Sequence, residues 1–176
     1  MKDEIILVDE KDNQVGTGEK MVVHKEGKLH RAFSVFIFNS KKELMLQQRA
    51  TSKYHSPGLW TNTCCSHPKP GEKIIDAAKR RLKEEMGFNC DLKEAFSFIY
   101  KAKFDNGLSE HEFDHVFIGK FDENPKPDKK EAESWKWITL AELRKDMKKN
   151  PEKYTYWLKV SIDKLVSYME SKKAFS

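Results

Sequence analysis

Residues 71–88, GEKIIDAAKRRLKEEMGF, carry the strongest local structural signal in this chain. Apolar residues recur there at spacings of three and four, which predicts one apolar stripe along a helix: Ile75, Ala78, Leu82 and Met86. Gly71 precedes this stripe, and Gly87 follows it where a helix-ending glycine usually stands. We therefore predict a helix over Glu72–Met86.

The polar side of this helix could carry chemistry. Arg81 and Glu85 are four residues apart and share a helix face. Glu84 and Glu85, with Arg80 and Arg81 beside them, could hold a hard cation that bridges phosphate oxygens. The alternative is an ordinary salt-bridged surface helix.

The preceding segment, residues 60–68 (WTNTCCSHP), places Cys65 two residues before His67 in what we interpret as a turn. Thiols, imidazoles and carboxylates together suggest chemistry at a metal, because these groups ligate ions and move protons. Adjacent cysteines can also simply be small buried apolar residues. We assign that packing role to Cys64.

Strands are expected on both sides of the central helix, at Ile5–Asp9, Arg31–Phe38, Leu44–Arg49, Phe96–Phe104, Glu110–Phe121 and Trp135–Ile138. Turns are expected at Asp12–Asn13, at Gly16 and Gly18, and at 105–107, and a loop over His24–His30. Two further helices should begin at Thr139, where Glu142 completes a capping box, and at Pro151. Because strands and helices do not alternate regularly, we predict an α/β (α+β) fold with a mixed sheet.

Length and composition limit the class of protein. The 176 residues, 38% apolar and 35% charged, fit one soluble domain over 1–176. Long apolar runs are missing, and the acidic start resembles neither a signal nor a transit peptide. The three cysteines, two of them adjacent, favour a reducing compartment, so we expect the cytoplasm. The net charge of +5 suits a small anionic substrate, and without a basic stripe we expect no nucleic acid, no membrane and a monomer.

Three histidines and two glutamates form a candidate metal site. His24, His30 and His67 lie in or beside predicted loops, and Glu110 and Glu112 share one face of a predicted strand. Five such ligands suit a transition ion such as Mn²⁺ or Zn²⁺. The alternatives are solvated loop histidines and an exposed face of an edge strand.

Other residues could contact phosphate or a developing positive charge. Lys20, Arg49 and Lys53 could contact phosphate, or could be ordinary surface cations. Most of the aromatic residues in the C-terminal half should be core, but one ring facing a pocket could stabilise a carbocation.

Taken together, these segments resemble the type I isopentenyl-diphosphate isomerases, which have a Nudix-like fold. The resemblance runs from about Glu4 to Trp157. It is carried by residues 60–68 and by three further segments in the same order: 16–20 (GTGEK), 29–34 (LHRAFS) and 109–113 (SEHEF). The fold implied is a mixed sheet packed between helices.

The chain departs from the usual Nudix pattern at two positions. Ser66 stands where the pattern has its first glycine, and Arg81 replaces the first acid of its Arg-Glu pair. The missing acid argues against the metal cluster of a pyrophosphohydrolase. A cation at Arg81 instead favours holding a diphosphate without cleaving it.

The resemblance implies a role for each matching residue. Cys65 and Glu112 would lie on opposite faces of the substrate, and Tyr100 would assist Glu112. The transition-metal ligands would be His24, His30, His67, Glu110 and Glu112, and Glu85 would hold Mg²⁺ together with the substrate diphosphate. The diphosphate contacts would be Lys20, Arg49, Lys53 and Arg81, and Trp157 would cover the allylic cation.

The implied reaction is the interconversion of isopentenyl and dimethylallyl diphosphate by a 1,3-proton shift. Two alternatives stay open from the sequence. One is a Nudix hydrolase acting on a nucleoside diphosphate derivative, and the other is a non-catalytic module that binds metal or nucleic acid.

Overall fold

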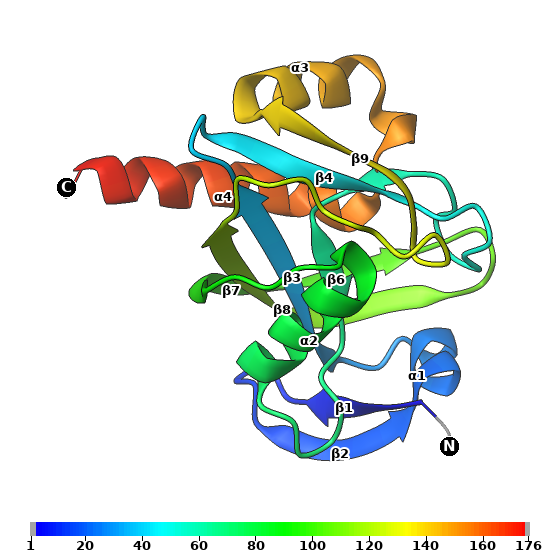
Figure 1. Ribbon diagram of the computed structural model, residues 1–176. Coiled ribbons are helices and arrows are strands. Elements are labelled where there is room, and N and C mark those ends of the chain that lie inside the picture. Colours follow the sequence, from blue (N-terminus) through cyan, green and yellow to red (C-terminus); the bar gives the residue numbers. More distant parts are fainter. Residues whose placement is uncertain (1–2, 175–176) are drawn as a thin grey trace.

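The computed structural model describes residues 3–174. Over this range the chain forms one nine-stranded mixed sheet with four α-helices and a short 3-10 helix (Figure 1). The strands are β1 Glu4–Val8, β2 Gln14–Glu19, β3 His30–Phe38, β4 Glu43–Arg49, β5 Trp60–Thr61, β6 Cys64–Ser66, β7 Leu92–Lys103, β8 Ser109–Lys120 and β9 Ala132–Thr139. The helices are α1 Lys20–Glu26, α2 Ile74–Met86, α3 Leu140–Lys149, η1 Pro151–Lys153 and α4 Tyr156–Ala174.

Strand β3 is the centre of the sheet. It pairs in parallel with β8 along its whole length, from His30 opposite Glu112 to Phe38 opposite Lys120. It also pairs antiparallel with β6, and it meets β1 and β4 near its two ends. Strand β4 continues the sheet through β9 and β5, and β8 continues it through β7.

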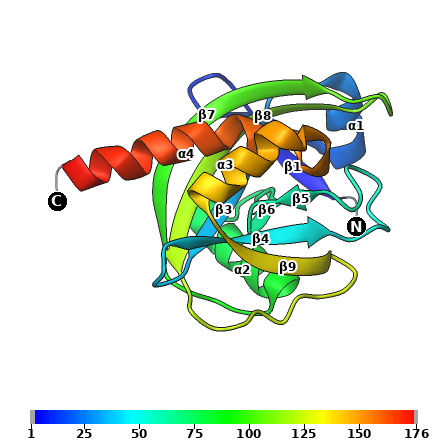
Figure 2. The same cartoon turned by 90° about the horizontal axis from the view of Figure 1, so that it is seen from above.

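Helices cover both faces of this sheet, as predicted. Phe33, Val35 and Ile37 of β3 share a core with Leu82 and Met86 of α2. The alternate residues Phe36 and Phe38 share a second core with residues of α3 and α4, including Leu143, Leu158 and Leu165. Seen from above, α4 extends beyond the rest of the molecule (Figure 2).

The predicted central helix is confirmed, although it begins two residues late, at Ile74. Glu72 instead receives two hydrogen bonds from the Arg80 guanidinium and one from the Lys69 amide, which ties the preceding loop to the helix. At the other end Gly87 adopts a left-handed conformation with φ 76°, and its amide bonds to the Lys83 carbonyl.

The predicted loop over His24–His30 is wrong, because His24 lies in helix α1 and His30 begins β3. The Glu19 carboxylate caps α1 by accepting from the Met21 and Val22 amides, and left-handed Gly27 ends the helix. The turn at Asp12–Asn13 is confirmed between β1 and β2, with a positive φ at Asp12.

Two further expectations about turns are wrong. Gly16 and Gly18 lie within β2 rather than in turns. Residues 60–68 contain the short strands β5 and β6. Buried polar side chains hold this segment extended: the Asn62 amide donates to the carbonyls of Val35 and Cys64.

The remaining expected elements are present with shifted ends. The turn at 105–107 is confirmed, and Gly107 there has φ 79°. Strand β7 begins four residues earlier than predicted, at Leu92. The capping box of Thr139 and Glu142 is confirmed. Pro151 opens the short helix η1, and α4 follows from Tyr156.

A polar network ties the β1–β2 hairpin to the sheet, on the face of β8 opposite to that of Glu110 and Glu112. The Asp12 carboxylate accepts from Arg31 Nε at 2.7 Å and lies 2.9 Å from His115 Nε2. The other ring nitrogen of His115 lies 2.6 Å from a Glu94 oxygen. Strands β3, β7 and β8 are thereby all joined to the β1–β2 turn.

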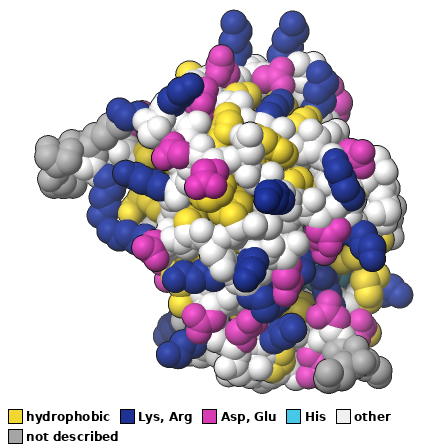
Figure 3. Space-filling view, viewed as in Figure 1, with side chains coloured by type: hydrophobic (Ala, Val, Ile, Leu, Met, Phe, Trp, Pro, Cys, Tyr) yellow, Lys and Arg dark blue, Asp and Glu magenta, His cyan; other side chains and the backbone are white. Residues whose placement is uncertain are grey.

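The surface shows no single-sign stripe on the face seen in Figure 3, where basic and acidic side chains alternate. Among residues 3–174, none of the helices has the length and apolarity required to cross a membrane.

Gly87 and Gly107 provide a matched test of how closely the end of helix α2 packs against Lys126. A Cβ built on Gly87 would lie 2.3 Å from the Lys126 carbonyl oxygen, whereas one on Gly107 meets nothing within 4 Å. Both glycines have positive φ, so alanine at either costs about 1–2 kcal/mol of backbone strain. The clash at Gly87 should add about 1–3 kcal/mol.

We therefore expect Gly87→Ala to lower the free energy of unfolding clearly more than Gly107→Ala, as measured by urea denaturation. Equal losses for the two variants would contradict the close packing of Gly87 against Lys126.

Candidate active site

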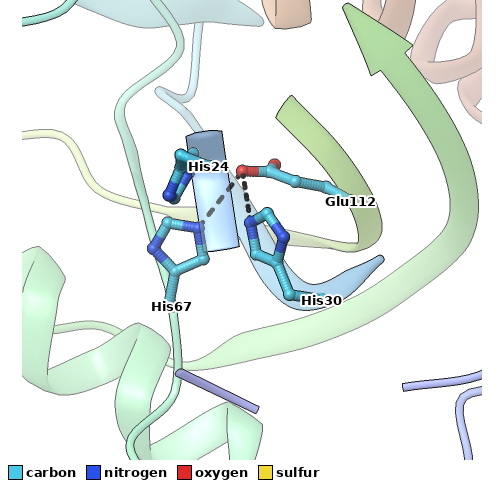
Figure 4. A group of neighbouring side chains, drawn as sticks. All are labelled: His24, His30, His67 and Glu112. Carbon is cyan, nitrogen blue, oxygen red and sulfur yellow. Dashed lines mark hydrogen bonds and ion pairs between the residues drawn. The ribbon is translucent and has the colours of Figure 1, made fainter. Parts of the chain in front are cut away.

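Four side chains from four parts of the chain converge at one end of the sheet (Figure 4). His24 comes from α1, His30 from the start of β3, His67 from the loop after β6, and Glu112 from β8. One ligand atom from each lies within 4.8 Å of those of the others. The parallel register of β3 and β8 accounts for one pair directly, because His30 is opposite Glu112.

The orientation of the imidazoles suits a bound cation. The Nδ1 atoms of His24 and His30 lie 2.7 and 2.8 Å from the backbone carbonyls of Lys20 and Lys28. Since a carbonyl only accepts, each Nδ1 carries a hydrogen, and in the neutral ring each Nε2 presents a lone pair to the cluster.

Two further observations agree with a metal site. The buried His30 Nε2 has no hydrogen-bond partner in the described part of the chain, although Glu112 Oε1 lies 3.5 Å away at ion-pair distance. Burial lowers the pKa of His24, and it lowers the pKa of His67 to about 3, so these rings are neutral. Neutral imidazoles and one carboxylate are a donor set that fits a divalent transition ion.

Glu110, the fifth predicted ligand, lies outside this group of four. It does point to the same side of β8 as Glu112, as the period-two spacing predicts. Its Oε2 accepts from the Tyr100 hydroxyl at 2.9 Å, and its Oε1 lies 3.0 Å from His55 Nε2.

The Tyr100 hydroxyl lies between the two glutamates and can donate its single hydrogen to either one; the shorter contact, 2.6 Å, is with Glu112 Oε2. Burial and the charges of Glu112 and Glu110 raise the pKa of Tyr100, so the phenol is a neutral donor. Burial and the neighbouring Glu112 also raise the pKa of Glu110. Burial alone would raise the pKa of Glu112 too, but the neighbouring imidazoles of His30 and His67 hold it well below its usual value.

Cys65 lies across β3 from Glu112. It is opposite Ser34 in the β3–β6 pairing and lines the same cavity as Tyr100 and Glu112. Cys64, one residue earlier, points to the other face and is fully buried in the core with α2. Burial raises the pKa of the Cys65 thiol, and the Arg49 charge opposes this only in part. The sulfur is therefore a neutral thiol in the substrate-free cavity.

The predicted basic residues line the same cavity: Lys20, Arg49, Lys53 and Arg81. Three of them are already paired with carboxylates, and one of these is Lys20, whose Nζ lies 3.6 Å from an Asp3 oxygen. Arg81 contacts Glu84 at 2.6 Å, Glu85 at 2.7 Å and Glu131 at 3.3 Å, and Lys53 also pairs with Glu131. An anion that binds at this end has to compete with Glu131.

Glu85, the predicted Mg²⁺ ligand, is 5% exposed at the edge of the cavity. One of its oxygens accepts from Arg81, and the other accepts from the Gln47 amide at 2.9 Å. It therefore lies beside the basic end of the cavity, where a hard cation could contact both Glu85 and a bound diphosphate.

Trp157, the predicted aromatic cover, is buried in the cavity wall at the start of α4. The Arg49 guanidinium carbon lies 5.2 Å from the centre of its ring. The cavity that these side chains enclose has a volume of about 110 Å³. This is below the volume of about 300 Å³ at which pockets for drug-sized ligands begin, so it favours a small substrate.

Several residues at the site carried no clear signal in the sequence: Ser34, Gln47, His55, Asp114 and Glu131. Asp114 could have been found, since it continues the inward row of Glu110 and Glu112. Burial raises the pKa of Asp114 well above its usual value, and its carboxyl group accepts from the Ser34 hydroxyl at 2.8 Å. Glu131 follows a loop, and only the folded structure places it beside Lys53.

Comparison with known proteins agrees with this geometry. Residues 28–158 match the NUDIX domain family. An isopentenyl-diphosphate Delta-isomerase 2 of Aromatoleum aromaticum is 57% identical, with 95% of this chain and 88% of that protein covered. An isopentenyl-diphosphate Delta-isomerase of Serratia proteamaculans is 52% identical, with coverage of 89% and 88%.

Solved structures agree on the fold. The DR0079 protein of Deinococcus radiodurans superposes with a TM-score of 0.77 at 22% identity, covering 92% of this chain and 98% of that one. A MutT protein of Methanosarcina mazei gives 0.67 at 16% identity, with coverage of 82% and 96%. The chain therefore belongs to the NUDIX domain family and, within it, to the isopentenyl-diphosphate Delta-isomerases.

Proposed function

We propose that this chain interconverts isopentenyl diphosphate and dimethylallyl diphosphate by a protonation–deprotonation 1,3-allylic shift. The observation that carries the proposal is the arrangement of the cavity. Cys65 lies on one side of β3, the Tyr100–Glu112 pair lies on the other, and four cationic side chains line the same space. The names of the relatives at 57% and 52% identity support the same substrate.

The difficult step is to protonate an unactivated alkene and reach a tertiary carbocation. Glu112, held by the Tyr100 hydroxyl, would give or take a proton at one carbon. Cys65 would take or give a proton at the neighbouring carbon from the opposite face. When bound, a Mn²⁺ or Zn²⁺ ion at the histidines and glutamates and a Mg²⁺ ion at Glu85 would neutralise carboxylate and diphosphate charge.

The pKa directions bear on which group starts as the acid. The pKa of Cys65 is raised and the pKa of Glu112 is lowered. The site therefore favours a neutral thiol and an ionised carboxylate. This arrangement suits protonation by Cys65, the reverse of an assignment in which Glu112, helped by Tyr100, is the acid and Cys65 is the base. In a reversible reaction each group is the acid in one direction and the base in the other, so both assignments use the same pair.

The remaining residues would position and protect the substrate. Lys20, Arg49, Lys53 and Arg81 would contact the diphosphate, and Glu131 would give up its ion pairs to it. Remote binding of this kind can hold the alkene between acid and base. Trp157 would cover the cation and exclude water, which would otherwise capture it as an alcohol.

The nucleoside diphosphate hydrolase is the weaker candidate. Arg81 stands where that reaction needs a metal-binding acid, and it pairs with Glu84 and Glu85. We further propose that the protein works in the cytoplasm, since its three cysteines are free thiols. We also propose that it works as a monomer and without nucleic acid, the latter because basic and acidic side chains are interspersed on the face seen in Figure 3.

The assay that tests this function uses isopentenyl diphosphate, Mg²⁺ and deuterated water. We expect deuterium in the recovered substrate and formation of the allylic isomer, because each turnover exchanges a proton with the protein. Phosphate release without isomer would support the hydrolase instead, and binding without either product would support a non-catalytic module.

The two adjacent cysteines offer a matched pair for the proton-transfer role. Cys65→Ala should abolish turnover while diphosphate binding, measured calorimetrically, is retained. Cys64→Ala should keep turnover and lower only the free energy of unfolding, because Cys64 packs in the core. An active Cys65→Ala variant would remove this residue from the mechanism.

Removal of bound metal tests the histidine cluster. Treatment with a chelator should reduce turnover at least about 100-fold, and Mn²⁺ or Zn²⁺ should restore it. Glu112→Gln should lose both the bound ion, measured by elemental analysis, and the activity. Glu94→Gln removes a glutamate that also contacts a histidine but lies outside the cluster, and it should keep both. Full activity of the metal-free protein would contradict the assignment.

A further inference from the structure

His55 is a buried histidine that the reaction described above does not use. Its Nε2 lies 3.0 Å from Glu110 Oε1, and the side chain lines the same cavity as Cys65 and Glu112. Because a carboxylate oxygen accepts, we assign the hydrogen to Nε2 and treat His55 as the donor.

This contact is the outer end of a continuous chain of hydrogen bonds. From His55 it passes through the two oxygens of Glu110 to the Tyr100 hydroxyl, 2.9 Å from Glu110 Oε2, and then to Glu112, 2.6 Å from Tyr100. Glu110 can rotate about its side-chain bonds, so its two protein partners, His55 and Tyr100, restrict where its carboxylate lies, as a bound ion also would. Removing one partner leaves a buried acceptor unpaired and frees the group to turn.

The ring of His55 is itself held in place. Phe104 packs against it edge-on, with ring centres 4.2 Å apart, and the Trp157 ring lies 5.6 Å away. The backbone is fixed too, since the His55 carbonyl accepts from Arg49 Nε at 3.2 Å and from Arg49 Nη2 at 2.9 Å. The donor at Nε2 therefore has a defined position relative to Glu110.

We propose that His55 is a positioning residue: its hydrogen bond fixes the Glu110 carboxylate, which in turn holds the Tyr100 hydroxyl against Glu112. His55 acts through these two residues and touches no reacting atom. The inference rests on the proposed isomerase function for its kinetic consequence, but its structural consequence is independent of any activity.

The alternative is that His55 only fills space between Phe104 and Trp157. Two substitutions separate these roles. His55→Phe keeps an aromatic ring between its neighbours and removes the donor. His55→Gln removes the ring and places an amide nitrogen at nearly the reach of Nε2.

We expect His55→Phe to lower kcat about 10- to 100-fold, as is typical for loss of a supporting hydrogen bond, and to leave KM nearly unchanged. His55→Gln should recover most of the lost kcat. The control is His115→Phe with His115→Gln, because His115 also contacts carboxylates but points to the other face of β8. Both control variants should keep the parental kcat.

Equal activity of His55→Phe and the parent would overturn the proposal, and so would equal impairment of the Phe and Gln variants. A crystal structure of His55→Phe decides the matter without an assay. In that structure we expect the Glu110 carboxylate to lie beyond hydrogen-bond distance of the Tyr100 hydroxyl. A Glu110 that stays in place refutes the positioning role even if the enzyme is active, whereas a parent that never isomerises the substrate refutes only the proposed function.

Discussion

The pairing of β3 on both of its edges is the constraint on which the site depends. On one edge, parallel pairing with β8 places His30 opposite Glu112. On the other edge, antiparallel pairing with β6 places Ser34 opposite Cys65. Because side chains alternate along a strand, a shift of one residue in either register would turn Cys65 or Glu112 into the other face. Cys65 and Glu112 therefore line the same cavity only in this register, which the two apolar cores on either side of β3 hold in place.

The second theme is how the fold accommodates many buried charges. The glutamates at 85, 110 and 112 are all nearly inaccessible, and burying an unpaired carboxylate is costly. Each has partners within the protein: Arg81 and Gln47 for Glu85, His55 and Tyr100 for Glu110, and Tyr100 with His67 for Glu112. These contacts hold the carboxylates where ions would bind them, and they hold Arg81 where a diphosphate would bind. Buried networks of this kind are expected to be sensitive to single changes, because every member depends on its neighbours.

The sequence predicted those parts of the fold that follow from local periodicity. Helix α2, its end at Gly87 and the capping box at Thr139 are local patterns, and all three are confirmed. Helix α1 was missed because its seven residues show no clear apolar stripe and its N-cap is a glutamate rather than a serine or aspartate. Strands β5 and β6 were missed for a different reason: buried side chains such as Asn62, which contact β3, hold them extended.

The same distinction applies to the site. The inward row of Glu110 and Glu112 follows from strand periodicity. The three histidines and Cys65 were candidates by residue type, and the resemblance gave them their roles. Gln47, His55 and Glu131 are placed only by tertiary contacts. The most direct test of the whole account is a crystal structure with isopentyl diphosphate, a saturated and therefore unreactive analogue. We predict its hydrocarbon between Cys65 Sγ and the Glu112 carboxylate, with its diphosphate against Lys20, Arg49, Lys53 and Arg81. A hydrocarbon found outside that space, or Cys65 and Glu112 on the same side of it, would contradict the account.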